Sequence, residues 1–158
     1  MILNTVTLRV LVVGASQLLA KDRCGTSDPF AVLKMGSQRH QTEVILKSLN
    51  PVWNASFDFV IDGNSPLPLE IKVWDKDYVG RDFLGNLVVN VSDFVLGGSG
   101  RRALIWDDAS NVQQSYLLVG GEGGEITLRM GIVGTDIADS IDALRLSGTY
   151  RFPCMSCH

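Results

Sequence analysis

The chain has 158 residues and a formal net charge of −3, and its composition is 46% hydrophobic and 20% charged. This length predicts one domain with a buried core, and the composition excludes a disordered or collagen-like chain. A nucleic-acid partner is not expected, because such a protein presents a strongly basic face. Three cysteines are too few for a disulfide scaffold, which favours a reducing compartment.

No segment is long enough to cross a bilayer. The most apolar stretch, Val10–Ala20, is about half of the roughly 20 residues that a spanning helix needs. The amino terminus also lacks the positively charged start of a secretory signal peptide. We therefore expect a cytoplasmic protein.

Stretches of alternating apolar and polar residues recur along most of the chain. This period of two indicates a strand that buries one face. The strands expected on this basis are Val6–Val12, Phe30–Met35 (a shorter apolar run), Phe57–Ile61, Leu69–Val73, Leu87–Val91 and Ile126–Ile132, with weaker candidates at Gln41–Leu46 and Ser115–Val119.

Clusters of Gly, Pro, Asn and Ser separate these strands, as expected for turns. About eight short strands with such punctuation favour an all-β antiparallel sandwich. The only helical pattern covers Thr135–Leu146, where Thr135 is a suitable cap. We therefore expect a sandwich domain over residues 1–133, followed over residues 134–158 by a short amphipathic helix and a tail or linker.

Five aspartates fall in two loops between the expected strands. Asp22 and Asp28 belong to the first acidic loop, and Asp75, Asp77 and Asp82 belong to the second. A lone aspartate in a loop is often only a turn former. Loops at one end of a sandwich lie close together, however, and five carboxylates there would repel without a cation. Hard oxygen ligands in flexible loops suit Ca²⁺, which takes 6–8 oxygens.

Several motifs frame these loops: Leu8–Ala15, Lys21–Phe30, Leu49–Asn54 with Phe57, and Val73–Asp77 with Phe83–Gly85. In this order they resemble the C2 domain family, and the resemblance extends from Thr7 to Val133. The sequences of these motifs are most similar to the C2 domain of fungal phosphatidylserine decarboxylases. The resemblance implies an eight-stranded antiparallel β-sandwich that binds calcium between its loops.

The resemblance also implies a ligand set. Asp22 and Asp28 match the first-loop ligands, Asp75 and Asp77 match a central pair that bridges two ions, and Asp82 matches the last ligand. The second acidic loop departs from the family pattern, since it has one acid where two adjacent acids are common. The backbone carbonyls of Lys21 and Lys76 would complete the shell.

C2 domains occur in two circular permutations, and the strand order suggests which one is present. One permutation begins with a strand of the Gly-x-Ile-x-Leu type, but only six residues precede Thr7. A segment of that type, Gly124–Met130, comes near the end instead. We therefore expect the phospholipase C-like (type II) topology.

The function that the resemblance implies is calcium-dependent binding to an anionic phospholipid membrane of the phosphatidylserine type. The bound ions would reverse the local charge and bring the parent protein peripherally to the membrane. Membrane contacts are expected at the loop tips, at Arg23, Cys24, Tyr78 and Val79. A candidate headgroup-binding set on the concave face is Lys34, Arg39 and Lys47.

Catalysis is not expected, because no nucleophile elbow, phosphate loop or metalloprotease helix is present. Two alternatives to the calcium hypothesis remain open. One is a calcium-independent C2 module that binds another protein. The other is a non-catalytic fragment of a lipid-metabolising enzyme whose catalytic domain lies elsewhere in the parent protein.

Overall fold

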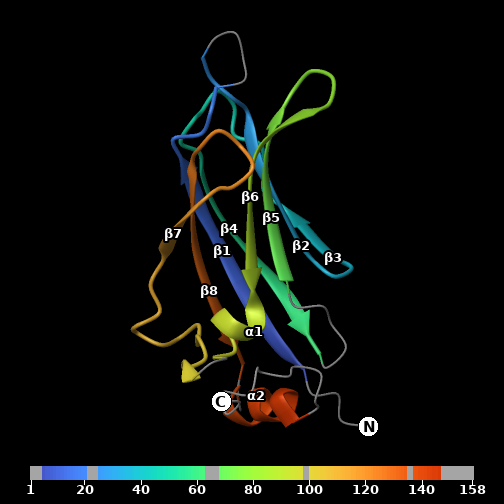
Figure 1. Ribbon diagram of the computed structural model, residues 1–158, viewed down its shortest axis with the longest axis vertical. Coiled ribbons are helices and arrows are strands. Elements are labelled where there is room, and N and C mark those ends of the chain that lie inside the picture. Colours follow the sequence, from blue (N-terminus) through green and yellow to red (C-terminus); the bar gives the residue numbers. More distant parts are fainter. Residues whose placement is uncertain (1–4, 21–24, 63–67, 98–99, 135–136, 147–158) are drawn as a thin grey trace, which may run out of the picture.

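A computed structural model describes residues 5–20, 25–62, 68–97, 100–134 and 137–146 (Figure 1). These residues form two four-stranded sheets and two helices. The elements are β1 (Val6–Ser16), β2 (Pro29–Met35), β3 (Gln38–Gln41), β4 (Val52–Ile61), β5 (Pro68–Lys76), β6 (Arg81–Asn90), α1 (Val91–Phe94), β7 (Gln114–Leu117), β8 (Glu125–Val133) and α2 (Ile137–Leu146).

The two sheets have the strand orders β4-β1-β8-β7 and β3-β2-β5-β6, and every pair within them is antiparallel. The expected eight-stranded antiparallel sandwich is therefore confirmed for the described residues. The last strand, β8, pairs with the first, β1, over nearly the whole length of both. The assignment to the phospholipase C-like permutation stays a prediction.

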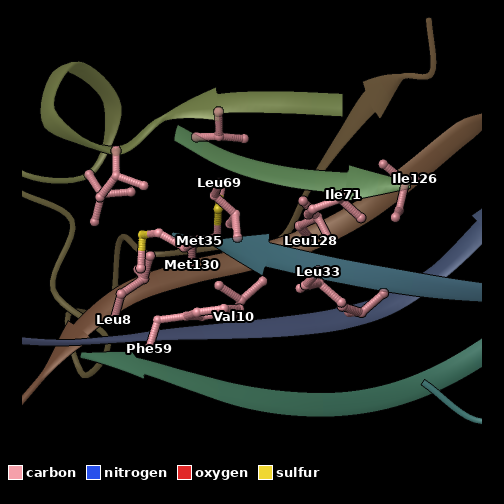
Figure 2. Close-up of a cluster of buried hydrophobic side chains, with 14 of the residues drawn as sticks. Leu8, Val10, Leu33, Met35, Phe59, Leu69, Ile71, Ile126, Leu128 and Met130 are labelled. Carbon is pink, nitrogen blue, oxygen red and sulfur yellow. The ribbon is translucent and has the colours of Figure 1, made fainter. Parts of the chain in front are cut away.

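The core lies between the two sheets (Figure 2). Along β1 every second side chain from Val6 to Val12 is buried, as the period of two predicts. The facing sheet supplies β2 and β5, whose inner residues are also buried. The labelled core side chains in Figure 2 are Leu8, Val10, Leu33, Met35, Phe59, Leu69, Ile71, Ile126, Leu128 and Met130.

The two sheets are joined at a point on each side of the sandwich. On one side the Gln38 side chain, on β3, bonds both backbone groups of Val60, on β4, at 2.7 Å. On the other side, Asn86 of β6 exchanges two backbone hydrogen bonds of 2.8 Å with Val119. These links leave the two ends of the sandwich to the loops.

Three expectations about local structure need correction. The strand expected at Gln41–Leu46 is wrong, since β3 ends at Gln41 and the next residues form a loop. Thr42 and Ile45 donate backbone hydrogen bonds to Ala31 and Pro29, which holds this segment against β2. The strand expected at Ser115–Val119 is displaced, because β7 is Gln114–Leu117.

The third correction concerns the end of β6. The strand stops at Asn90, and Val91 begins the short helix α1. The carboxy-terminal helix is confirmed as α2, although Thr135, its expected cap, lies outside the described residues. Ile141 and Leu144 of α2 are buried in the same core as the sheets. The domain boundary at residue 133 stays a prediction.

Candidate metal and membrane site

The start of β2 and the turn from β5 to β6 lie at one end of the sandwich, at the top of Figure 1. Asp28 immediately precedes β2, Asp75 lies near the end of β5, and Asp82 lies near the start of β6. The register pairs Pro29 with Asp75, and Asp75 with Asp82. Strand pairing therefore brings acids from both loops together, as the sequence predicted.

Asp28 connects three segments of this end. Its N–H donates to Asp75 Oδ1 at 2.7 Å, and its own Oδ1 accepts the Lys47 N–H at 2.7 Å. Its carbonyl oxygen accepts the Lys76 N–H at 2.9 Å. The β3–β4 loop is thus fastened to the first acidic loop, a link that the sequence did not predict.

Asp75 is the most constrained acid of the site. The residue is 0% exposed, and the Asp28 N–H is the recorded partner of its Oδ1. Its Oδ2 is buried without a hydrogen-bond partner, and no ion pair of Asp75 is recorded among the described residues. A buried, uncompensated carboxylate costs several kcal/mol. An oxygen-seeking cation would satisfy this atom.

Asp82 adds to the negative charge beside Asp75. The two residues are directly opposite each other in the β5–β6 ladder, and Asp82 is exposed. Opposite residues of an antiparallel pair project to the same face, and like charges in that position are destabilising. The pair therefore favours a cation between the strands.

Asp77 begins the turn that joins β5 to β6. Its N–H donates to the Gly80 carbonyl oxygen at 3.1 Å, and Gly80 has a φ of +94°, a conformation that favours glycine. This turn carries Tyr78 and Val79 at its tip, where they are 105% and 86% exposed. The expected contact of these two side chains with a membrane is geometrically open.

The remaining expected site residues have different outcomes. Lys76 is exposed, and its N–H donates a hydrogen bond to the backbone carbonyl oxygen of Asp28. Lys21, Asp22, Arg23 and Cys24 lie outside the described residues. Within the described part of the chain, no three acidic, His or Cys side chains form a ready metal-binding group. The donors that are described are all oxygens, which fits Ca²⁺ and not a soft metal.

One apolar residue at this end was missed by the sequence analysis. Leu46, in the β3–β4 loop, is 70% exposed and adjoins Lys47, whose N–H bonds Asp28. The sequence signal was an apolar run that looked like a strand, so the residue was assigned to a sheet instead of a loop tip.

A basic groove runs over the outer face of the second sheet. Lys34 and Arg39 are direct cross-strand partners in it, as the candidate headgroup set requires. Lys47 does not join them, since it lies beside Asp28. The groove is lined by Val32, Lys34, Arg39, Glu70, Lys72, Trp74 and Arg81.

Two cations of this groove, Lys72 and Arg81, were missed by the sequence analysis. Lys72 forms an ion pair with Glu70 at 3.2 Å. The Arg81 guanidinium stacks over the Trp74 ring at 4.0 Å from its centroid. Lys72 and Trp74 are two residues apart on one strand, and this spacing alone could have placed them on the same face of the sheet.

Fold and site together define a β-sandwich with an acidic loop cluster at one end and a basic groove on one face. A family model described as C2 domain matches residues 6–106. The chain belongs to the C2 domain family. None of the helices in the described part of the chain is long and apolar enough to span a membrane.

Curated relatives match part of the chain. Synaptotagmin-5 of Arabidopsis thaliana is 35% identical over 91 residues, which cover 56% of this chain and 16% of that protein. Extended synaptotagmin-1 of Mus musculus is 37% identical over 97 residues, which cover 58% of this chain and 9% of that protein. The chain therefore corresponds to a small share of each relative.

Solved structures match most of the chain. A calcium-bound structure of two C2 domains of extended synaptotagmin 2 superposes with a TM-score of 0.66 at 24% identity, covering 83% of this chain and 46% of that one. A C2 domain of plant extended synaptotagmin 1 has a TM-score of 0.60 at 25% identity, covering 80% of this chain and 93% of that one.

Proposed function

We propose that this chain is a calcium-dependent module that binds anionic phospholipid membranes and brings its parent protein to them. The observation that carries the proposal is Asp75, a buried carboxylate with one oxygen that has no hydrogen-bond partner among the described residues. Burial of such a group is costly unless a cation compensates it. Extended synaptotagmin 2, a solved structure of the same fold, is described as calcium bound.

The residues proposed to hold calcium come from both acidic loops. Asp28, Asp75 and Asp82 are brought to one end by strand register. Asp77 and the carbonyl of Lys76 follow directly on β5. The set is completed by Asp22 and the carbonyl of Lys21.

Charge explains why membrane binding should require calcium. The chain carries a net charge of −3, and this end holds the acidic cluster, so an anionic bilayer is repelled. Bound calcium reverses the local field, which acts over roughly 8–10 Å at physiological salt. A lipid phosphate or carboxylate can then approach the loaded loops.

Shallow insertion would add a hydrophobic contribution. Tyr78 and Val79 project from the second acidic loop, and Arg23 and Cys24 are proposed to contribute from the first. Tyr suits an interface because its ring is apolar and its hydroxyl is wet. Leu46 extends this set to the β3–β4 loop.

The basic groove is proposed as a second contact with headgroups. Lys34 and Arg39 line this groove, whereas Lys47 lies beside Asp28 at the end of the sandwich that carries the acidic residues. Lys72 and Arg81 add two cations, and Glu70 partly neutralises Lys72. The proposed location is the cytoplasm, with peripheral membrane association in calcium. The narrower similarity to fungal phosphatidylserine decarboxylases stays a prediction.

The test is co-sedimentation with vesicles of phosphatidylserine and phosphatidylcholine, in calcium and in chelator. The wild-type chain should pellet with vesicles only in calcium. Asp75→Asn combined with Asp77→Asn should abolish this binding, since both positions are proposed ligands. Asp139→Asn is the control, because it neutralises an exposed carboxylate on α2, at the opposite end of the sandwich (Figure 1).

Other outcomes would reject parts of the proposal. Equal binding with and without calcium would move the membrane contact to the basic groove or the loop tips. Absence of binding in both conditions would favour the protein-interaction alternative. Tyr78→Ala should weaken binding without changing the calcium-induced rise in melting temperature, and loss of that rise would show that the loop itself had been disturbed.

A further inference from the structure

The edges of β6 and β7 approach each other along one side of the sandwich. Asn86 of β6 and Val119, just after β7, form an isolated antiparallel bridge through two backbone hydrogen bonds of 2.8 Å. Continuing that register would place Val88 opposite Leu117. No pairing between these two residues exists in the described structure, so the two edges separate below the bridge.

The backbone direction at this edge follows from the bridge. Asn86 directs both its N–H and its C=O toward Val119 and therefore away from β5. Backbone groups alternate in direction along a strand, so the N–H and C=O of Val88, two residues further along β6, also point away from β5. They have no recorded hydrogen-bond partner within the described residues. The same parity turns the backbone of Leu117 away from β8. An open edge of this kind is a template for another strand.

A groove occupies the space between the separated edges. Its volume is about 410 Å³, and its lining residues are Leu87, Val88, Val89, Asn90, Asp93, Phe94, Arg101 and Tyr116. Phe94 and Tyr116 meet edge to face at 6.1 Å between ring centroids. Val88 and Leu117 remain 54% and 73% exposed on the outer side. We call this groove the β6–β7 seam.

Charge at the seam is unevenly compensated. Asp93 accepts a hydrogen bond from the Asn90 side-chain amide at 2.9 Å. Arg101 is exposed, and no ion pair or hydrogen bond of its guanidinium is recorded in the described part of the chain. The seam therefore offers an uncompensated cation beside an apolar floor.

We propose that the β6–β7 seam binds an extended segment of a partner polypeptide, which pairs with the free edge of β6 and places a carboxylate on Arg101. The outward N–H and C=O of Val88 offer a donor and an acceptor side by side, a pattern that the backbone of another strand complements and that a lipid or a small anion does not. Alternate side chains of such a segment would meet Phe94 and Tyr116 on one side and Val88 and Leu117 on the other. Pairing of this type derives affinity from the main chain and specificity from the side chains.

The test uses a fluorescein-labelled, capped peptide of alternating Val and Thr with one terminal Glu, titrated with the full chain in chelator and without vesicles. These conditions make the outcome independent of calcium and membranes. Fluorescence anisotropy should report binding, and the same peptide N-methylated at alternate residues should bind at least tenfold more weakly.

Protein variants locate the contact. Val88→Pro removes an outward N–H that no strand uses, a change tolerated at sheet edges, and should weaken binding at least tenfold at unchanged helix and strand content by circular dichroism. Val88→Ala should also weaken binding, whereas Val112→Ala, at a valine 62% exposed outside the seam, should not. Arg101→Gln should weaken binding severalfold and Arg102→Gln should not.

Three results would overturn the proposal. The first is absence of peptide binding, and the second is equal affinity of the methylated and unmethylated peptides. The third is a concentration-dependent dimer of the chain that Val88→Pro dissociates, which would assign the seam to a second copy of the chain.

Discussion

Replacing Asp75 by Asn tests the buried carboxylate directly. In chelator the change weakens a charge-assisted hydrogen bond from the Asp28 N–H to a neutral one, at about 1 kcal/mol. It also leaves a buried amide without a partner, at about 1–3 kcal/mol. Against this, it removes a buried charge whose penalty is several kcal/mol. The variant should therefore be at least as stable as the wild type without calcium.

Calcium should reverse that ranking. A ligand that binds only the native state at 100 times its Kd stabilises it by about 2.7 kcal/mol. At about 2–4 °C per kcal/mol for a domain of this size, the wild-type melting temperature should rise by about 5–11 °C. The variant should lose this rise because the partnerless oxygen of Asp75 is proposed as a ligand.

The assay is thermal unfolding by circular dichroism in chelator and in saturating calcium, with Asp139→Asn as the control. A calcium-induced rise that persists in the Asp75 variant would refute its role as a ligand. A loss of more than about 3 kcal/mol in chelator would refute the buried-charge reasoning, because that is the cost of breaking an already compensated pair.

Two further predictions concern the scaffold. Phe59→Ala, at a fully buried ring of β4, should lower the free energy of unfolding by about 3–5 kcal/mol in urea denaturation, and a loss below about 1 kcal/mol would contradict the packing (Figure 2). The hydrogen bond from Arg9 holds the pKa of Asp58 below its usual value, so Arg9→Gln should raise that pKa in an NMR titration, and no change would contradict the ion pair. The pair's stabilisation is present above the unfolded-state pKa of the carboxyl group and is lost as pH falls through the lower folded-state pKa. Both side chains are more than a third exposed, so it should stay below about 1 kcal/mol.

The sheets could be predicted largely from the chain because each strand buries one face. The alternation from Val6 to Val12 marks the inner face of β1, and the structure buries the same side chains. Local pattern failed at Gln41–Leu46, where an apolar run forms a loop. There, backbone hydrogen bonds to β2 hold the segment, and such bonds depend on residues distant in sequence.

Part of the candidate site could likewise be predicted from the sequence, and part depended on the tertiary structure. The residue types alone showed that two loops carry acidic oxygens suited to a hard cation, since the acids are visible in the chain itself. Only the tertiary structure decided that Asp75 is buried with a partnerless oxygen and that Asp82 lies opposite it. The second fact follows from the register across β5 and β6, and the first from how the surrounding segments pack around Asp75.

The surfaces away from the loops depended most on the fold. Lys34 and Arg39 could be proposed from the sequence, but Lys72 and Arg81 join them only because four strands align side by side. The opening between β6 and β7 has no sequence signature, since it arises where two edges stop pairing. The sequence determines which strand faces are apolar or charged. The pairing of strands that are distant in the sequence decides which of these faces lie side by side and where a groove opens between them.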